Sequence, residues 1–365
     1  MVYSPVKLRT PERDKEAKVK TPFLILRVFI LGLTAGGAGE TPTALPEESP
    51  VETVQPEEAP DEPLPPETAD PNSNTHRKGG YAMNLCDREA LRTLLGRHGF
   101  HFSKSMGQNF LIDPAVPADI AAASQADRTC GVLEIGPGVG CLTAELAERA
   151  GKVISVELDK KLLPVLAETM EPFDNVEIIP GDALKLDIQA LAAEKLPGLR
   201  PLVCANLPYN ITTPVLTKLV ETPCFESITV LLQKEVAQRL AAPQGSGGGG
   251  AFTLWLQYYM ETDILFDVTA EKFFPVPKVD SAVLRCVRRV KPAVSVENEA
   301  FFFRCLRGAF LLRRKTLANS LAAALPEKGR EAVQAAIEDC GLPPSIRGEK
   351  LTLEDFAALA AALAK

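Results

Sequence analysis

The feature that most constrains the fold is an apolar run followed by a glycine-rich turn at residues 131–140. Residues 131–135, GVLEI, have the length and composition of a buried strand, and the turn GPGVG occupies 136–140. Helical periodicity then extends over 141–150. Glycines at such a junction let the backbone approach a ligand where a side chain would block it. These residues therefore predict a strand, a turn and a helix, with a binding site at the carboxyl end of the strand.

Strands and helices continue to alternate beyond this unit, a pattern typical of a parallel sheet wrapped by helices. Further strands are predicted at 152–157, 176–179, 202–205 and 228–232. Two later apolar runs, 262–269 and 280–289, have no helix between them and predict an antiparallel hairpin at the edge of the sheet. The run FTLWLQYY at 252–259 is strand-like as well. We therefore expect an α/β fold.

The C-terminal residues follow a different pattern. Residues 296–365 are almost wholly helical in periodicity, which predicts a small all-α domain with a boundary near 290–296. We accordingly assign residues 83–292 to the α/β domain and residues 293–365 to the helical domain. The run GSGGGG at 245–250 predicts a mobile loop, which we expect near the substrate.

The first 82 residues are unlike the remainder. Residues 22–33 form a short apolar run that resembles a secretory signal, although about a dozen residues are too few to span a bilayer. Residues 40–71 hold ten acidic residues, nine prolines and no Lys or Arg, a composition that predicts disorder. A second start lies at Met83, ahead of a helical pattern. We expect residues 1–82 to be a disordered or non-native extension and the functional protein to begin at Met83.

Composition limits the other kinds of site. The eight cysteines include no C-x-x-C pair and the three histidines add no ligand spacing, so neither a metal site nor a disulfide framework is predicted. The net charge of −7 is unevenly distributed, because residues 271–365 carry 16 Lys and Arg against 11 Asp and Glu. Nine of these cations lie between Arg285 and Lys315, which favours an anionic partner, with a solvated helix face as the alternative.

Two carboxylates follow the glycine-rich turn at successive strand ends. The pattern E-x-G-x-G-x-G at 134–140 differs from the dinucleotide pattern G-x-G-x-x-G, and no G-K-[ST] of a P-loop follows it. Glu157 ends the next strand, where a carboxylate accepts hydrogen bonds from both ribose hydroxyls. Asp182 follows the strand after that, where it can accept from an adenine amino group. This combination predicts an adenosine-containing ligand without phosphates, and S-adenosylmethionine fits best.

The stretch ANLPYNI at 205–211 ends another strand at the same edge of the sheet. Methylating an adenine amine is difficult because the nitrogen lone pair is delocalised into the ring, so a site must favour tetrahedral nitrogen. The side-chain oxygen of Asn206 and the carbonyl of Leu207 can accept hydrogen bonds from the amine. Pro208 makes the turn rigid, and Tyr209 supplies a face on which the base stacks. The alternative is a plain turn, but the position beside the predicted cofactor favours an active site.

Seven motifs occur together in this chain. They are KSMGQNFLID (104–113), VLEIGPGVG (132–140), VELD (156–159), GDAL (181–184), ANLPYNI (205–211), FFPVPKVDSAV (273–283) and FLLRRKTLANSL (310–321). With these motifs, residues 83–365 closely resemble the small-subunit ribosomal RNA adenine dimethyltransferases, the kasugamycin-sensitivity methyltransferase family. The resemblance implies a Rossmann-like class I methyltransferase sheet with a small C-terminal all-α domain.

The resemblance also implies a reaction and a set of site residues. The family transfers two methyl groups from S-adenosylmethionine to each of two adjacent adenosines in the 3′-terminal hairpin loop of 16S rRNA, in the 30S subunit, during small-subunit biogenesis. The implied cofactor-binding residues are Gln108, Asn109, Leu111, Gly136, Gly138, Glu157, Asp182 and Asn206. The implied catalytic residues are Asn206, Leu207, Pro208, Tyr209 and Phe274, and the implied RNA-binding residues are Arg313, Arg314 and Lys315. We expect a cytoplasmic monomer that uses neither metal nor membrane.

Two rival functions stay open at this point. An erythromycin-resistance type methyltransferase shares the fold, the cofactor and the reaction but modifies a large-subunit adenosine; the NLPY and FFPVPKVDS motifs favour the small-subunit group. A binding protein, such as a transcription or ribosome-assembly factor in which methyl transfer is secondary, is the second rival. The intact residues Asn206, Tyr209, Glu157 and Asp182 favour a working enzyme.

Overall fold

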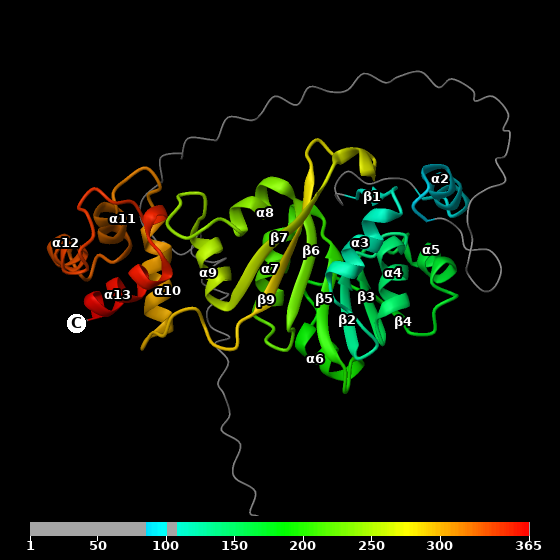
Figure 1. Cartoon of the computed structure of the whole chain (residues 1–365), viewed down its shortest axis with the longest axis horizontal. Coiled ribbons are helices and arrows are strands. Elements are labelled where there is room, and N and C mark those ends of the chain that lie inside the picture. Colours follow the sequence, from blue (N-terminus) through cyan, green and yellow to red (C-terminus); the bar gives the residue numbers. More distant parts are fainter. Residues whose placement is uncertain (1–84, 101–107, 365) are drawn as a thin grey trace, which may run out of the picture. The chain divides into compact units, whose positions relative to one another are not determined.

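The computed structural model describes residues 85–100 and 108–364, which belong to one compact unit, Arg77–Lys365 (Figure 1). The proposed extension at residues 1–82 lies outside the described residues. The centre of the unit is a seven-stranded sheet in the order β4-β3-β2-β5-β6-β9-β7. Its strands are β2 (Cys130–Ile135), β3 (Lys152–Glu157), β4 (Val176–Pro180), β5 (Arg200–Asn206), β6 (Ser227–Gln233), β7 (Met260–Val268) and β9 (Ser281–Arg288).

The sheet is parallel except at one edge. Strands β2 to β6 pair in parallel, while β9 pairs antiparallel with β6, and β7 pairs antiparallel with β9. Strand β7 is thus the edge strand of the predicted hairpin, and the expected α/β fold is confirmed. Every residue of β2 is buried, as expected for a parallel strand covered on both faces.

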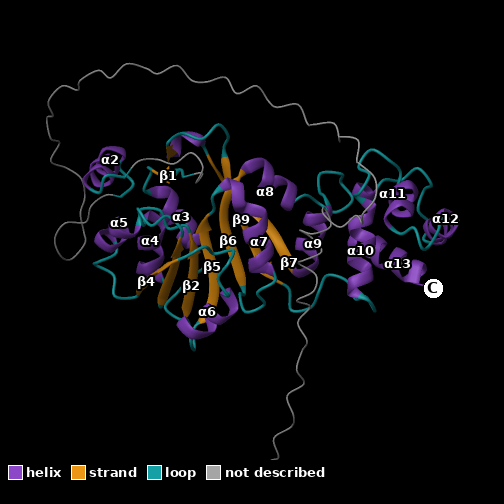
Figure 2. Ribbon diagram, turned by 180° about the vertical axis from the view of Figure 1, so that it is seen from behind, coloured by secondary structure: helices purple, strands orange, loops and turns teal. Residues whose placement is uncertain are grey.

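Helices flank the strands, which Figure 2 shows in orange. Within the sheet region they are α3 (Ala115–Ala123), α4 (Cys141–Arg149), α5 (Leu163–Thr169), α6 (Ile188–Lys195), α7 (Thr212–Val220), α8 (Lys234–Leu240) and α9 (Ala251–Tyr259). Helix α2 (Arg88–Arg97) precedes a two-stranded sheet of β1 (Phe110–Leu111) and β8 (Phe273–Phe274). None of the helices in the described part of the chain is both long and apolar enough to cross a bilayer.

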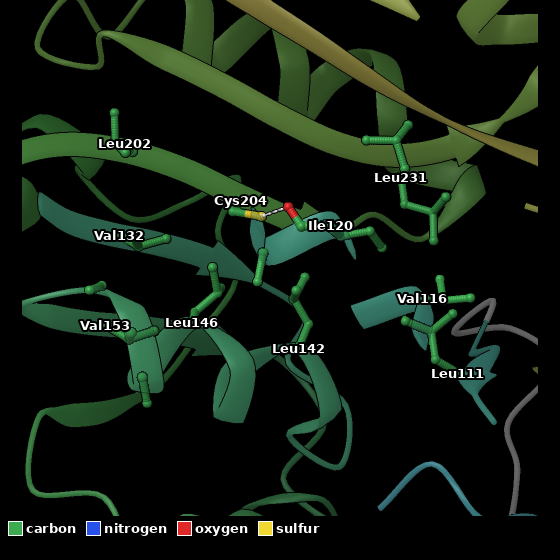
Figure 3. Packing of buried hydrophobic residues seen from close by; sticks show 14 of the residues in the cluster. Leu111, Val116, Ile120, Val132, Leu142, Leu146, Val153, Leu202, Cys204 and Leu231 are labelled. Carbon is green, nitrogen blue, oxygen red and sulfur yellow. Dashed lines mark hydrogen bonds between the residues drawn. The ribbon is translucent and has the colours of Figure 1, made fainter. Parts of the chain in front are cut away.

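The main core lies between the sheet and the helices α3 and α4. Side chains of alternate strand residues, such as Val132, Leu202 and Cys204, pack against Ile120 of α3 and Leu146 of α4 (Figure 3). All five are at most 3 % exposed. Because successive strand residues point to opposite faces, this packing specifies the register of the whole parallel sheet.

The strand-like expectation for residues 252–259 was wrong, because these residues form helix α9. Nearly every side chain from Thr253 to Tyr258 is buried, including Trp255. A helix that is buried on all sides has apolar residues at nearly every position. The periodicity of the sequence does not distinguish such a run from a buried strand. Thr253 Oγ1 also accepts a hydrogen bond from the backbone N–H of Gly250 at 3.1 Å, which helps to start the helix there.

Four helices follow the last strand of the sheet, and the first of them, α10, packs on α9. They are α10 (Glu299–Ala309), α11 (Leu317–Ala324), α12 (Arg330–Asp339) and α13 (Leu353–Ala364). Asn298 caps α10 through a 3.0 Å hydrogen bond from the backbone N–H of Phe301. The ring of Tyr258 lies 5.4 Å from that of Phe302 and 5.0 Å from that of Phe303. These aromatic contacts join the helical region to the end of the sheet region.

The glycine-rich loop also contacts the helical region, whereas we had expected it near the substrate. The Nζ of Lys350 donates to the carbonyl of Ser246 at 2.9 Å, and the Oε1 of Gln244 accepts from the backbone N–H of Leu353 at 2.8 Å. Gly245 has φ +72°, and a Cβ there would lie 3.2 Å from the carbonyl oxygen of Lys350. Glycine is therefore needed at position 245 for both its conformation and its close approach.

We predict that Gly245→Ala lowers the free energy of unfolding by about 1–2 kcal/mol, because alanine strains the left-handed backbone. Gly96→Ala is the control, since Gly96 lies within α2 and a Cβ there would meet nothing within 4 Å. The control should stabilise the protein by about 0.5–1 kcal/mol. Urea unfolding measures both changes, and an unchanged stability for Gly245→Ala would contradict the assignment.

Candidate active site

A cavity of about 260 Å³ opens where the carboxyl ends of β2, β3 and β5 meet. In a parallel sheet these ends share one edge, so residues far apart in the sequence come together there. The cavity is lined by the predicted residues Gln108, Asn109, Leu111, Gly136, Gly138, Glu157, Asp182, Asn206, Leu207, Pro208 and Tyr209. Phe274 and residues 313–315 do not belong to this lining.

The glycine-rich turn places its backbone against two other motifs. Gly136 and Gly138 have φ values of +73° and +64°, which favour glycine. A Cβ on Gly138 would lie 3.1 Å from the ring of Phe110, and a Cβ on Gly136 would lie 3.7 Å from the ring of Pro208. The turn is therefore packed between β1 and the ANLPYNI segment, and side chains at these two positions would fill the cavity wall.

Glu157 occupies the end of β3 and is only 6 % exposed. Its Oε1 accepts from the backbone N–H of Asp159 at 2.7 Å, and its Oε2 accepts from that of Gly138 at 3.4 Å. Burial raises the pKa of this carboxyl, and the two backbone donors oppose that shift. Each oxygen keeps a further lone pair, so Glu157 can accept the two hydroxyls of a ribose.

Gln108 lines the same cavity and has one buried side-chain oxygen without a partner among the described residues. Its Nε2 donates to the Oδ2 of Asp159 at 2.9 Å, whereas its Oε1 is buried and accepts no hydrogen bond from the described residues. A buried carbonyl oxygen of this kind normally has a partner. This oxygen, the glycine turn and Glu157 together fit a polar ligand such as a nucleoside.

Asp182 lies in a turn that is supported by Lys218, a residue that we did not identify from the sequence. The Oδ1 of Asp182 accepts from the backbone N–H of Leu184 at 3.0 Å. Lys218 of α7 donates its Nζ to the carbonyl of Leu184 at 2.8 Å and also to that of Leu186. Desolvation lowers the pKa of Lys218. Lys218 thus holds the turn that carries Asp182; its only sequence signal is a single Lys in the apolar helix TTPVLTKLV.

Glu134, the acidic residue of the glycine motif, is also buried beside the cavity. The hydroxyls of Thr143 and Ser155 both donate to its Oε2, at 2.7 and 2.6 Å. Burial is the largest influence and raises the pKa of Glu134 to about 7, while the two hydroxyls oppose the shift. The carboxyl is therefore close to half protonated at neutral pH.

We predict that Glu134 lowers the free energy of unfolding as pH rises from about 4.5 to about 7, because in this range its carboxyl stays protonated in the folded state and ionises in the unfolded state. The loss is on the order of 3 kcal/mol. Glu134→Gln keeps an oxygen that accepts from Thr143 and Ser155 but cannot ionise, so its stability should fall by about this amount less than that of the wild type. Burial also raises the pKa of Glu221 to about 7, and Glu221 contributes equally to both profiles. Urea unfolding between pH 5 and pH 8 measures the difference, and parallel pH profiles would contradict it.

The ANLPYNI segment directs its polar groups into the cavity from the end of β5. The Nδ2 of Asn206 donates to the carbonyl of Asn109 at 3.4 Å, and its Oδ1 accepts no hydrogen bond from the described residues. Leu207 is buried, and its backbone N–H donates to the carbonyl of Leu231 at 3.1 Å. The hydroxyl of Tyr209 lies 2.7 Å from that of Ser281, which orients the ring. Asn206 Oδ1 is thus the acceptor left to a ligand.

Phe274 lies beside the cavity without lining it. It is paired with Phe110 in the antiparallel register of β1 and β8. Its ring contacts two arginines of α2, with the guanidinium carbon of Arg88 4.8 Å and that of Arg92 5.0 Å from the ring centroid. The assignment of Phe274 to the site of the Asn206 to Tyr209 cluster therefore stays a prediction.

The basic run between residues 285 and 315 is divided in its roles. Arg288 donates to the carbonyls of Phe225 and Val220, each at 2.9 Å, and so joins the end of α7 to the loop that follows it. Arg289 and Arg304 form ion pairs with Glu261 and Glu327. By contrast, the side chains of residues 313–315 are exposed between α10 and α11. Only part of this run is free to face an anionic partner.

A search of known proteins agrees with these features. A profile of the family described as ribosomal RNA adenine dimethylase matches residues 99–365. The "Ribosomal RNA small subunit methyltransferase A" of Streptococcus agalactiae is 45% identical over 285 residues, 77% of this chain and 98% of that protein. The protein of the same name from Streptococcus pneumoniae is 44% identical over the same shares of the two chains.

This chain belongs to the ribosomal RNA adenine dimethylase family. The expectation of an rRNA methyltransferase with a class I methyltransferase fold is thereby confirmed. The cavity is consistent with this membership. Its lining includes residues of five of the seven motifs by which the sequence resembles adenine dimethyltransferases.

Two solved structures with different names have folds similar to that of this chain. The "23S rRNA methyltransferase ErmE" matches with a TM-score of 0.57 and 28% identity, over 70% of this chain and 100% of that chain. A "dimethyladenosine transferase from Plasmodium falciparum" matches with a TM-score of 0.58 and 25% identity, over 68% of this chain and 95% of that chain. The much higher identity to the streptococcal proteins favours the small-subunit group.

Proposed function

We propose that this protein dimethylates N6 of two adjacent adenosines in the 3′-terminal hairpin loop of 16S rRNA within the 30S subunit, using S-adenosylmethionine. The observation that carries the proposal is the position of Asn206, whose Oδ1 is open to the same cavity that Glu157 and Asp182 line. An amine acceptor and two nucleoside-binding carboxylates are thus close enough to serve one reaction.

The residues of the cavity would divide the binding of the cofactor among them. Glu157 would accept hydrogen bonds from the ribose, Asp182 would accept from the adenine, and the backbone of Gly136 would lie at the methionine end. Gln108, Asn109 and Leu111 would form a lid segment above it. When bound, S-adenosylmethionine supplies an electrophilic methyl group.

Asn206 and its neighbours would act on the target adenine. The Oδ1 of Asn206 and the carbonyl of Leu207 accept hydrogen bonds from the adenine amine and favour tetrahedral nitrogen. Tyr209 provides the stacking face, and its pKa is raised by burial, so the phenol stays neutral. The methylated nitrogen is acidic and loses its proton to water, so no strong base is needed. Phe274 would be the second aromatic of the site if the base extends beyond the cavity lining.

The RNA substrate would be bound both in the cavity and by the helical region. The base must leave its stack to enter the cavity, as is general for enzymes that act on nucleobases. Arg313, Arg314 and Lys315 would bind RNA phosphates from a helical domain at residues 293–365, next to a methyltransferase domain at 83–292. We infer a cytoplasmic monomer with a role in small-subunit biogenesis.

We predict that Glu157→Ala weakens S-adenosylmethionine binding by about 10- to 100-fold, because two hydrogen bonds to a charged acceptor are lost. Isothermal titration with the purified full chain measures the affinity. Glu171→Ala removes an exposed carboxylate outside the cavity and is the matched control. Equal affinities for the two variants would refute the ribose assignment.

We predict that Asn206→Ala lowers kcat for methylation of immature 30S subunits by about 100- to 1000-fold, the effect of removing a hydrogen-bonding group that acts in the transition state. Its affinity for S-adenosylmethionine should change far less, since Glu157 and Asp182 remain. Transfer of a labelled methyl group gives the rate, and mapping of the modified bases identifies the site. A variant that binds the cofactor and methylates at the wild-type rate would rule out this mechanism.

The structural likeness to ErmE keeps large-subunit rRNA as the second candidate substrate. Incubating the wild-type chain with immature 30S particles and, separately, with protein-free large-subunit RNA distinguishes the two. Methylation of the 30S particles alone supports the proposal. Methylation of the large-subunit RNA alone would replace it with the ErmE-like activity.

A further inference from the structure

Helix α2 carries two exposed arginines that share one aromatic ring. Arg88 and Arg92 are one helical turn apart, and both guanidinium groups lie within 5.0 Å of the centroid of the Phe274 ring. Like charges at this spacing repel each other. Stacking on a ring attracts each cation separately but does not neutralise the pair. The arrangement therefore leaves two concentrated positive charges at one point of the surface.

The two acidic residues at the start of α2, Asp87 and Glu89, form no ion pair with either arginine. Neither arginine forms an ion pair within residues 85–100 and 108–364, whereas Arg97 of the same helix pairs with Glu168 at 2.6 Å. Asp87 is engaged as the N-cap of α2, where it accepts from the backbone N–H groups of Glu89 and Ala90 at 3.0 and 2.8 Å. An external anion is thus the natural partner for the arginine pair.

The arginine pair is held firmly to the body of the protein. Leu91, Leu94 and Leu95 of α2 are at most 3 % exposed and pack in one cluster with residues of α4 and α5 (Figure 1). At the other end of the helix, His98 Nε2 lies 2.7 Å from Glu168 Oε2. Rigid placement reduces the entropy lost when the arginines bind a ligand.

A short chain of contacts connects the arginine pair to the adenine-accepting group. The arginines stack on Phe274, and Phe274 pairs with Phe110 across β1 and β8. Phe110 follows Asn109, whose carbonyl accepts from the Nδ2 of Asn206. The pair is therefore only a few residue widths from the mouth of the cavity. Neither guanidinium donates a hydrogen bond to a described residue, so its N–H donors remain for a phosphate.

We propose that Arg88 and Arg92 bind backbone phosphates of the RNA strand beside the target adenosine, as a contact separate from residues 313–315. This inference rests on the proposed function, because it takes rRNA as the ligand. Phe274 contacts both guanidinium groups in this arrangement, and this role takes the place of the base-stacking role that the family resemblance implies for it. The contact positions the strand at the cavity and does not touch the reacting nitrogen, so Arg88 and Arg92 are positioning residues.

The test uses the full chain with Arg88→Gln, Arg92→Gln and the double variant, and compares them with Arg97→Gln. The control removes one positive charge from the same helix but from a site that Glu168 already neutralises. Binding to immature 30S subunits and the KM for methylation are measured at several salt concentrations. In the double variant we expect binding to weaken by on the order of tenfold or more, and the slope of log K against log salt to fall by about 1 for each arginine.

Three further readouts keep the outcome clear. Affinity for S-adenosylmethionine and kcat at saturating 30S should stay near wild type in the double variant, and lysine at both positions should restore the salt slope. A double variant that binds 30S subunits with wild-type affinity and a wild-type salt slope would overturn the inference. A double variant that loses kcat or cofactor affinity while its salt slope is unchanged would also overturn it, because that result indicates a purely structural role. If the wild type binds 30S subunits but methylates no adenosine, the proposed function fails, while the binding comparison still decides the role of the arginines.

Discussion

The rest of the structure depends on the parallel pairing of β2 with β3 on one side and β5 on the other. In this register Leu133 lies opposite both Ile154 and Val203. Because the strands point the same way, the residues that follow them emerge at one edge, and three separate motifs come to line a single cavity. A slip of one residue in any strand would turn its core side chains to the opposite face and break up the site.

The parallel pairing also concentrates buried carboxyl groups at this edge. Burial raises the pKa of both Glu134 and Glu157, and each carboxyl is held by two donors from neighbouring segments. Those donors make the burial tolerable but do not remove the excess of negative charge. Such a site favours a ligand that brings hydroxyl donors and positive charge, which supports the proposal of S-adenosylmethionine as cofactor.

Much of the fold was predictable because the strands are short, apolar and separated by clear turns. The parallel sheet, the edge hairpin and the helical C-terminal region all followed from local periodicity, whereas the order of the strands did not. The failure at α9 has a physical cause: this helix is covered on nearly all sides, so its amphipathic pattern is lost. The role of the basic run stays a prediction, but charge in a sequence does not reveal that Arg288 donates to backbone carbonyls.

The sequence alone determined the class of protein and most of the residues that line the cavity, because the glycine turn, the two carboxylates and ANLPYNI each mark a strand end. Only the tertiary structure decided which partners these groups have. Lys218 behind the Asp182 turn and the arginine pair on Phe274 are examples. A sequence records local spacing and polarity, whereas such contacts join segments that approach each other only when the sheet and its helices pack.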